Sequence, residues 1–434
     1  MAKSHDDTLA DFTTDTRVLL LTGMAVLIGA ISAFVAYALV WLIGAITNLS
    51  YYLRLSSSFA SPNLDRLGYW SVLVPVAGGL IVGLMAYYGS EKIRGHGIPE
   101  ALEAILIGRS NIEAKVAVLK PLSSAIAIGT GGPFGAEGPI IMTGAAFGSL
   151  FAQFFDLSAA ERKTLLCAGA AGGMAAIFNA PFAAILIAVE LMLFEWKPRS
   201  FVPVAFAAVV ASAMRIPLLG GGAIFAVQPH LPLSGKGLLI CLVVGLIAGL
   251  ASIVLTNLVY GFEDLFRRLP VHWMWWPTIG GLFVGIGGLV DHRVLGVGYD
   301  VIHGMLDNKI VGFAIIGLII GKALVWSIAL GSGTSGGVLA PLLIIGGALG
   351  ILESHFIPMG DPGTWAMVSM AAVMGGTMGA PFTAIAFTVE LTHDVNMLPA
   401  IIVTCIASHV VTVLKMKRSI LTEKVARRGH HITR

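Results

Sequence analysis

Residues 129–139 read Gly129-Thr-Gly-Gly-Pro-Phe-Gly-Ala-Glu-Gly-Pro139 and place one carboxylate, Glu137, in a glycine-rich break between two apolar stretches. An ionisable side chain at membrane depth is costly, so Glu137 is a functional candidate. The alternative is a carboxylate that forms a structural ion pair between helices. The five glycines leave backbone N–H groups uncovered by side chains and able to face a ligand. An acid beside exposed backbone donors predicts an anion site that the acid can itself occupy.

The composition identifies the class of protein. Of the 434 residues, 56% are hydrophobic and 12% are charged, and the mean hydropathy is +0.88. A soluble domain carries about 25% charged residues, so we expect an all-α integral membrane protein. The formal net charge of +3 gives no reason to expect a nucleic-acid partner. Apolar stretches of unequal length, some opened by Gly or Pro, favour broken helices around a buried site; they include 18–46, 71–88, 139–154, 180–193, 201–214, 236–260, 274–290, 311–330, 336–353 and 396–414.

The two ends of the sequence differ from this apolar body. Residues 1–16 are polar and contain no recognisable signal peptide. From Lys415 to Arg434 there are seven Lys or Arg and one Glu, which predicts a cytoplasmic C-terminus in an inner or plasma membrane. The pair His430-His431 is expected to be solvated, because no third metal ligand lies nearby. The three cysteines are dispersed in apolar segments and predict no disulfide framework: Cys167, Cys241 and Cys405.

An internal repeat organises the chain. Residues 179–191 read NAPFAAILIAVEL and residues 379–391 read GAPFTAIAFTVEL, so eight of thirteen positions are identical at an offset of 200. Duplicated halves in a helical membrane protein indicate a transporter or channel with its site at the repeat interface. The expected units are a polar N-terminal segment, a first membrane repeat, a linker, a second membrane repeat and a basic C-terminal segment, over residues 1–16, 17–215, 216–234, 235–412 and 413–434.

A weaker echo at an offset of 202 relates the segment before Pro139 to the segment before Pro341. Proline fits the first turn of a helix, so both prolines predict helix N-termini deep in the membrane. Helix N-termini carry partial positive charge and attract anions. The residue aligned with Glu137 is Leu339, so one half supplies donors plus an acid and the other supplies donors alone.

Two further acids, Glu190 and Glu390, occupy equal positions in the repeats. Their equivalence favours a structural role, as hydrogen-bonded locks between helices, over a role in transport.

Four segments in order resemble the CLC family of chloride channels and chloride/proton exchangers. They extend over nearly the whole chain, and Lys120 also falls where that family has a lysine. Any one motif is weak, but four in order on a duplicated membrane chain form a specific pattern. The segments are Gly95-His-Gly-Ile-Pro-Glu100, Gly135-Ala-Glu-Gly-Pro139, Asn179-Ala-Pro181 and Gly336-Gly-Val-Leu-Ala-Pro341.

The resemblance implies two inverted-topology repeats whose broken and tilted helices meet at a central anion site. It also implies a homodimer in membrane lipid, with chloride or a similar small anion as the ligand and no cofactor. Glu137 would be the gate, taking the place of the anion until it is protonated or displaced. The backbone of three segments would hold the anion, at Gly95, His96, Gly97, Ile98, Gly135, Ala136, Gly138, Val338 and Leu339.

Three positions depart from the family pattern. His96 stands where the family often has a serine whose hydroxyl contacts the anion, and it could contact the anion or point away from it. Leu421 stands where the family often has a tyrosine in the inner pore, and we expect a hydrophobic residue there without ligand contact. Leu191 stands where many exchangers have a second glutamate that accepts protons from inside, so this proton route is expected to be missing.

These observations predict anion transport, most simply passive or weakly proton-coupled chloride conduction gated by Glu137. The alternative is a chloride/proton antiporter that uses another inner proton route, through water or histidine. An intramembrane enzyme or a structural membrane protein is a remote alternative, because the usual hydrolase, metalloprotease and P-loop motifs are absent from the sequence. We also expect no regulatory nucleotide-binding domain, and fluoride ranks low among the candidate anions.

Overall fold

The computed structural model describes residues 16–430, whose regular structure is helical, with two isolated β-bridges and no β-strand. Of the predicted polar N-terminal segment, 1–16, only residue 16 is among the described residues. His431 lies outside them. The first half contains α1 (Arg17–Tyr52), α2 (Leu73–Tyr88), α3 (Ile98–Leu106), α4 (Ala114–Gly129), α5 (Glu137–Gln153), α6 (Ala159–Phe178), α7 (Pro181–Ile187) and α8 (Pro198–Leu219). A π-helical turn, Ala188–Leu193, extends α7.

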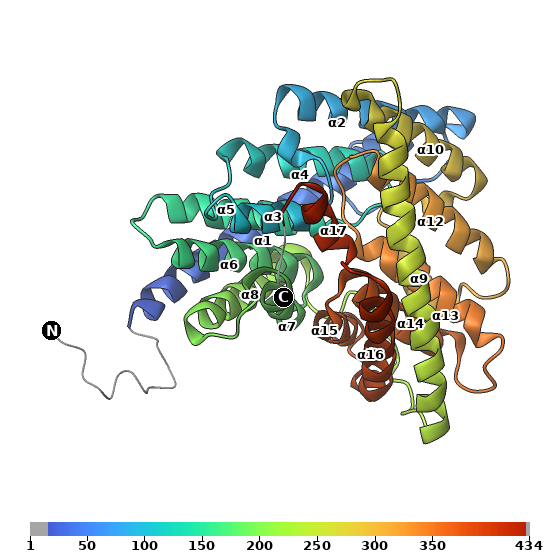
Figure 1. Ribbon diagram of the computed structural model, residues 1–434. Helices are drawn as coiled ribbons and strands as arrows, with labels where there is room; N and C mark the ends of the chain where they lie inside the picture. The colour runs from blue at the N-terminus through green and yellow to red at the C-terminus, as the bar shows by residue number, and fades with distance from the viewer. Residues whose placement is uncertain (1–15, 431–434) are drawn as a thin grey trace.

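The second half repeats this order. It contains α9 (Gly235–Arg267), α10 (Trp276–Val290), α11 (Tyr299–Leu306), α12 (Ile315–Gly331), α13 (Leu339–Ser354), α14 (Pro362–Met378), α15 (Pro381–Thr392) and α16 (Leu398–Lys415). A last helix, α17 (Ile420–Arg427), returns to pack against α3 of the first half. Figure 1 shows the halves side by side, with α2 beside α10 and α7 beside α15. The helices α8 and α16 end a few residues beyond the predicted unit boundaries, and the five-unit division stays a prediction.

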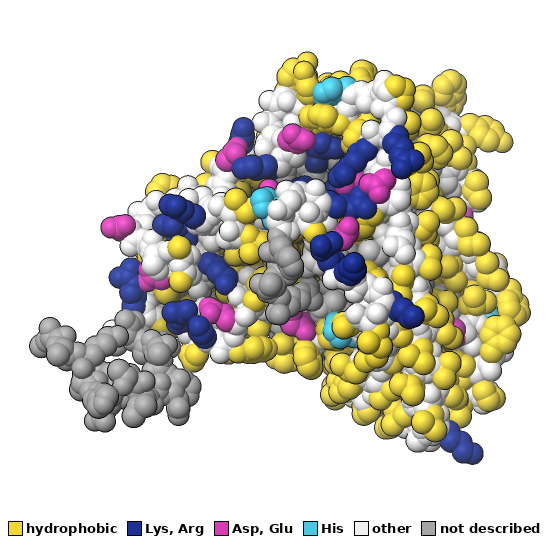
Figure 2. All heavy atoms as spheres, viewed as in Figure 1, with side chains coloured by type: hydrophobic (Ala, Val, Ile, Leu, Met, Phe, Trp, Pro, Cys, Tyr) yellow, Lys and Arg dark blue, Asp and Glu magenta, His cyan; other side chains and the backbone are white. Residues whose placement is uncertain are grey.

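The outer surface is suited to lipid. Six helical segments in the described chain are long and apolar enough to cross a membrane, and many of their large hydrophobic side chains are exposed. In Figure 2 hydrophobic atoms cover the right and lower margins, whereas charged side chains gather toward the centre of the visible face. Exposed apolar flanks and a polar end face are the arrangement expected of a membrane protein. The segments are Arg17–Tyr52, Gly68–Tyr88, Pro198–Leu219, Gly235–Arg267, Trp273–Val290 and Val395–Arg427.

The two halves run in opposite directions through the membrane. Helix α1 begins beside Glu161, with which Arg17 forms an ion pair, on the same side of the molecule as α3 and α17. Helix α9 instead ends on that side, where its Glu263 pairs with Lys424 of α17. At 1.5 Å per residue these helices of 36 and 33 residues are roughly 54 and 50 Å long, enough to cross a ~30 Å hydrocarbon layer. The predicted inverted-repeat, all-α architecture is confirmed.

Reciprocal contacts join the halves at the repeated Pro-Phe motif. The Glu190 carboxylate accepts hydrogen bonds from the backbone N–H groups of Phe382 and Thr383 in the first turn of α15. The Glu390 carboxylate accepts the equivalent bonds from Phe182 and Ala183 in α7, at 3.0 and 2.7 Å. Each acid satisfies donors that a helix N-terminus leaves unpaired and lies at its positive end. The predicted hydrogen bonds of Glu190 and Glu390 between helices are confirmed, and their structural role stays a prediction.

A second symmetric pair consists of buried lysines. Lys120 in α4 donates from Nζ to the carbonyls of Ile93 and Gly95, at 2.9 and 2.8 Å. Its counterpart in α12, Lys322, donates to the carbonyls of Val294 and Gly296, at 3.0 and 3.2 Å. Each lysine therefore holds the loop that precedes a short half-helix, α3 in one repeat and α11 in the other.

We expect Glu190→Ala to destabilise the protein by about 1–3 kcal/mol, because it leaves two N–H groups at the start of α15 without acceptors. Thermal unfolding of detergent-solubilised protein measures the effect. Glu113→Ala, which removes an exposed carboxylate just before α4, is the matched control and should change stability by less than about 0.5 kcal/mol. Equal melting temperatures for the two variants would contradict the lock.

Candidate functional site

The two glycine-rich segments meet where α5 and α13 begin. The Gly337 N–H donates to the Gly135 carbonyl at 2.9 Å, and the Gly95 N–H donates to the Thr334 carbonyl at 3.0 Å. Pro139 and Pro341 both lie in the first turn of their helices, as predicted. Three chain segments distant in sequence thus converge with two helix N-termini, which makes this point electropositive.

Glu137 lies at that point and has no solvent-exposed surface. Its Oε1 accepts a hydrogen bond from the backbone N–H of Leu339, the residue that occupies its own position in the other repeat. Its Oε2 has no hydrogen-bond partner among residues 16–430. A carboxylate bound by one helix N-terminus, with its second oxygen unpaired, occupies an electropositive point and retains an acceptor for a proton.

The glycines around Glu137 are required by space. A Cβ on Gly135 would lie 1.8 Å from Glu137 Oε2, and one on Gly337 would lie 2.3 Å from Oε1. On Gly138, a Cβ would lie 1.7 Å from the His96 carbonyl oxygen. No side chain fits at these three positions without moving the carboxylate or the neighbouring backbone. The glycine-rich composition is therefore the condition for burying the acid against backbone donors.

The first predicted anion segment supplies fewer N–H groups than its length suggests. The Gly95 N–H is bonded to Thr334, and the Gly97 N–H donates to Glu100 Oε2 at 2.7 Å. The N–H groups of Ile98 and Val338 donate to no acceptor within residues 16–430. These two amides are available as donors in this conformation, and the role of each segment residue in anion binding stays a prediction.

The three departures from the family pattern are all buried. His96 is 3% exposed, and its Nδ1 has no hydrogen-bond partner among the described residues. Leu421 is fully buried at the start of α17, and Leu191 is fully buried in the π-helical turn after α7. Leu191 lies in a π-helical turn, which the sequence did not predict, and such turns often occur at functional sites.

Two cavities approach this site from opposite sides. The first, which we call the α17 cavity, has a volume of about 390 Å³ and is lined by Gly95, Gly333, Lys424 and Arg428 among others. The second, the Tyr299 cavity, has a volume of about 330 Å³ and is lined by Phe59, Ala136, Arg215 and Tyr299 among others. It lies beside the C-terminal half of α1, at Val40, Ile43 and Gly44, so it is on the side of the membrane away from α17. Each cavity reaches a residue of the glycine-rich segments, which suits a route for a small ion.

Comparison with known proteins agrees with this geometry. The family described as voltage gated chloride channel matches residues 77–413 of the chain. The chain belongs to this family, the CLC family. The putative chloride channel protein ClcB-like of Ralstonia nicotianae is 30% identical over 356 residues, covering 79% of this chain and 83% of that relative. The voltage-gated ClC-type chloride channel ClcB of Salmonella typhimurium is 28% identical over 359 residues, covering 80% and 85%.

Solved structures share the CLC fold. The crystal structure of a slow cyanobacterial Cl⁻/H⁺ antiporter matches with a TM-score of 0.84 at 22% identity, covering 96% of this chain and 99% of that one. The crystal structure of a CLC-type fluoride/proton antiporter matches with a TM-score of 0.77 at 21% identity, covering 92% and 97%. The chain is therefore an integral membrane protein of an anion-transport family, as predicted from the four motifs.

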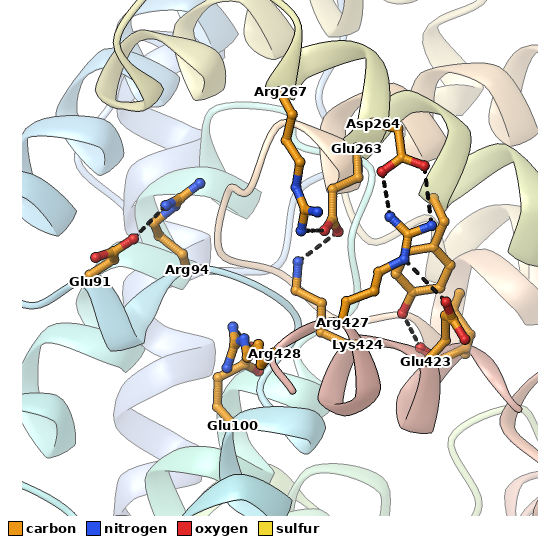
Figure 3. A network of polar contacts seen from close by, with 12 residues as sticks. Glu91, Arg94, Glu100, Glu263, Asp264, Arg267, Glu423, Lys424, Arg427 and Arg428 are labelled. Atoms are coloured by element: carbon orange, nitrogen blue, oxygen red, sulfur yellow. Dashed lines mark hydrogen bonds and ion pairs between the residues drawn. The ribbon is translucent and has the colours of Figure 1, made fainter. Parts of the chain in front are cut away.

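A group of ion pairs ties α17 of this CLC protein to the rest of the fold (Figure 3). Arg428 reaches Glu100 at 2.8 Å, and Lys424 reaches Glu263 of α9 at 2.6 Å. The other oxygen of Glu100 accepts from Gly97 N–H, so the charge of Arg428 is linked to the cap of α3. We call these residues, with Asp264, Arg267 and Arg427, the α17 cluster.

The α17 cluster sets the ionisation of Glu100, which lies outside the candidate membrane spans. Burial alone would raise the pKa of its carboxyl, but the nearby positive charges, that of Arg428 foremost, lower the pKa to about 2. Glu100 is therefore ionised at any physiological pH and remains an acceptor for the α3 cap.

Several site features were missed from the sequence. Lys322 could have been found, because it lies at the same offset of 202 from Lys120 that relates the two glycine-rich segments. The pairing of Arg428 with Glu100 spans 328 residues, and no local pattern signals it. Arg215 and Tyr299 also come together only in the folded chain.

We expect Arg428→Gln to remove part of the acid sensitivity of folding. The folded-state pKa of Glu100 is depressed from 4.5 to about 2, so its contribution to stability is full above about pH 4.5 and is lost as the pH falls toward 2. Without Arg428 the pKa rises, and the difference in melting temperature between pH 6 and pH 3.5 should shrink. The control is Arg418→Gln, which removes a more exposed α17 ion pair; an equal change in both variants would contradict the role of Arg428.

Proposed function

We propose that this CLC protein conducts chloride across the membrane through the site at Glu137, with Glu137 as the gate. The observation that carries the proposal is the buried Glu137 carboxylate, bound through Oε1 to the Leu339 N–H at the start of α13 and unpaired at Oε2. Chloride and the carboxylate compete for the same positive helix end, because the space between glycines admits one negative group at a time. Protonation removes the charge of the competitor and favours the anion.

Passive or weakly proton-coupled conduction is the form we favour. A proton exchanger needs an acid or another carrier between the gate and the inner solution. At the position where many family members have such an acid, this chain has Leu191, which is buried among apolar side chains and cannot bind a proton. The relatives named as ClcB channels are consistent with this form.

Chloride/proton antiport is the second candidate, and a specific observation supports it. His96 is buried, its backbone contacts the segment of Glu137, and its Nδ1 has no partner among the described residues. Burial lowers the pKa of His96 to about 3, so this histidine would carry a proton only in a conformation that admits water on the α17 side of the gate. The structural neighbours described as Cl⁻/H⁺ and fluoride/proton antiporters have the same fold, so the fold is compatible with antiport.

The setting of the protein is part of the proposal. We place it in an inner or plasma membrane with α17 at the cytoplasmic face, because Lys and Arg are concentrated from Lys415 onward. We propose a homodimer, as the family resemblance implies, and chloride as the ligand without a cofactor. Cross-linking in native membranes would test the dimer directly.

We expect Glu137→Gln to raise chloride flux and to weaken its pH dependence, because the neutral amide mimics the protonated gate. Chloride efflux from proteoliposomes between pH 4.5 and 8 measures both effects. Glu113→Gln, an exposed carboxylate outside the site, is the control and should behave as the wild type. If the pH dependence of Glu137→Gln equals that of the wild type, another group such as His96 controls the gate.

We expect the reversal potential to follow the chloride gradient alone. Passive conduction moves no proton with the anion, so imposing a proton gradient at equal chloride should leave the potential at zero. Crossed chloride and proton gradients across proteoliposomes, read with a voltage-sensitive dye, make the measurement. A potential that shifts with the proton gradient would overturn passive conduction and favour the antiport route.

A further inference from the structure

We propose that Arg215 and Tyr299 form a second anion-binding site in the Tyr299 cavity, on the side of the gate away from α17. The ligand class is a small inorganic anion, with chloride as the first candidate. This site would hold the anion before or after it passes Glu137. The inference rests on the proposed anion transport and adds a binding step to it.

The first argument is the state of Arg215 near the end of α8. Its residue surface is 8% exposed, and its Nε has no hydrogen-bond partner among residues 16–430. Its Nη1 donates to the Gly220 carbonyl, which fixes the guanidinium but does not neutralise it. Tyr299 lines the cavity beside it, and no Asp or Glu of the described chain is in that lining. A buried cation without a counter-ion is costly, and a bound anion would remove that cost.

The second argument is the state of Tyr299 at the start of α11. Its hydroxyl is buried and has no partner among residues 16–430. Three rings hold its own ring in place: Phe59, stacked at 6.2 Å between centroids, Phe225 at 5.5 Å and Phe178 at 6.4 Å. A fixed phenol with an unpaired O–H is a hydrogen-bond donor prepared for an acceptor. Both polar side chains in the lining can donate a hydrogen bond, and only Arg215 carries a charge, which favours a negative ligand.

The third argument is position. Ala136, the residue immediately before Glu137, lines the same cavity as Arg215 and Tyr299. Tyr299 also lies close enough to Glu137 and to Arg215 to be influenced by the charges of both. The cavity of about 330 Å³ is large enough for a hydrated chloride ion. An anion held there is next to the gate and attracted by a full positive charge.

Inverted symmetry explains why a second site should exist here. Tyr299 begins α11, whose counterpart α3 begins at Ile98 beside the α17 cavity. The α17 cavity is rich in cations, including Arg94, Lys424 and Arg428. On the opposite side Arg215 is the charged residue among those that line the cavity in the described chain. The cations of the α17 cavity are paired with carboxylates such as Glu91 and Glu263, whereas Arg215 has none in the lining of its own cavity and is available to attract an anion.

The test combines anion location with affinity. Crystals of the wild-type protein grown with bromide should show an anomalous peak in the Tyr299 cavity, next to Arg215, in addition to any peak at the Leu339 segment. Arg215→Gln should abolish the cavity peak and leave the other. In proteoliposomes Arg215→Gln should raise the half-saturating chloride concentration roughly tenfold, the usual effect of losing a charged hydrogen bond. Tyr299→Phe should raise it by a smaller factor.

Matched variants separate a site from a general charge effect. Arg199→Gln removes an exposed arginine from the start of the same helix and should leave affinity unchanged, whereas Arg215→Lys retains the charge and should keep most of the affinity. Equal shifts for Arg215→Gln and Arg199→Gln, or a cavity peak that persists in Arg215→Gln, would overturn the site. If Arg215→Gln does not fold, absence of the wild-type cavity peak together with unchanged affinity of Tyr299→Phe overturns it. Wild-type protein that carries the peak but no flux would defeat the proposed transport and leave the site standing.

Discussion

The structure depends on one interaction, the burial of the Glu137 carboxylate against the N-terminus of a helix from the other repeat. A carboxylate without solvent exposure needs donors at its own depth in the membrane, and the first N–H groups of α13 are available because no residue precedes them in the helix. This requirement explains why α13 begins at Leu339, directly after the glycine-rich segment. It also fixes the glycines, because a Cβ at Gly135 or Gly337 would overlap the carboxylate. The buried carboxylate, the start of α13 and the glycine-rich backbone thus follow from one constraint.

The same constraint explains how the two halves differ. Most equivalent pairs make equivalent contacts: Glu190 and Glu390 bind each other's helix starts, and Lys120 and Lys322 each hold a loop. At Glu137 and Leu339 the symmetry is broken, because one residue contributes a carboxylate and the other a backbone N–H. Two acids at these positions would repel each other across one buried site. With a single acid the site has more backbone N–H donors than carboxylate oxygens, and such a site attracts an anion.

The sequence was sufficient for the architecture and for the place of Glu137 at the start of α5, but not for the surroundings of Glu137. The repeated Ala-Pro-Phe and Val-Glu-Leu, the prolines in first turns and the isolated acid are local patterns with direct physical meaning. They predicted duplicated halves and helix N-termini at Pro139 and Pro341, and the family resemblance added the inverted topology. The state of individual N–H groups was not predictable, because Gly95 and Gly97 lose theirs to Thr334 and to Glu100 only after folding. In the sequence nothing distinguishes Arg215 from the other arginines of predicted helices. Its lack of a carboxylate partner appears only when the C-terminal half of α1, the end of α8 and the start of α11 come together.

Asymmetry between the two cavities follows from the inverted fold. Repeats of opposite direction present equivalent backbone to opposite faces, so any functional difference between the faces must come from side chains. On the α17 side the added helix brings cations that are already paired, such as Lys424 with Glu263 and Arg428 with Glu100. On the other side no helix is added, and the cavity relies on Arg215, which has no carboxylate partner in the described chain. Paired cations hold protein segments together, whereas an unpaired buried cation is stabilised by a mobile anion. The fold therefore uses its charges for structure at one entrance and leaves one for the ion at the other.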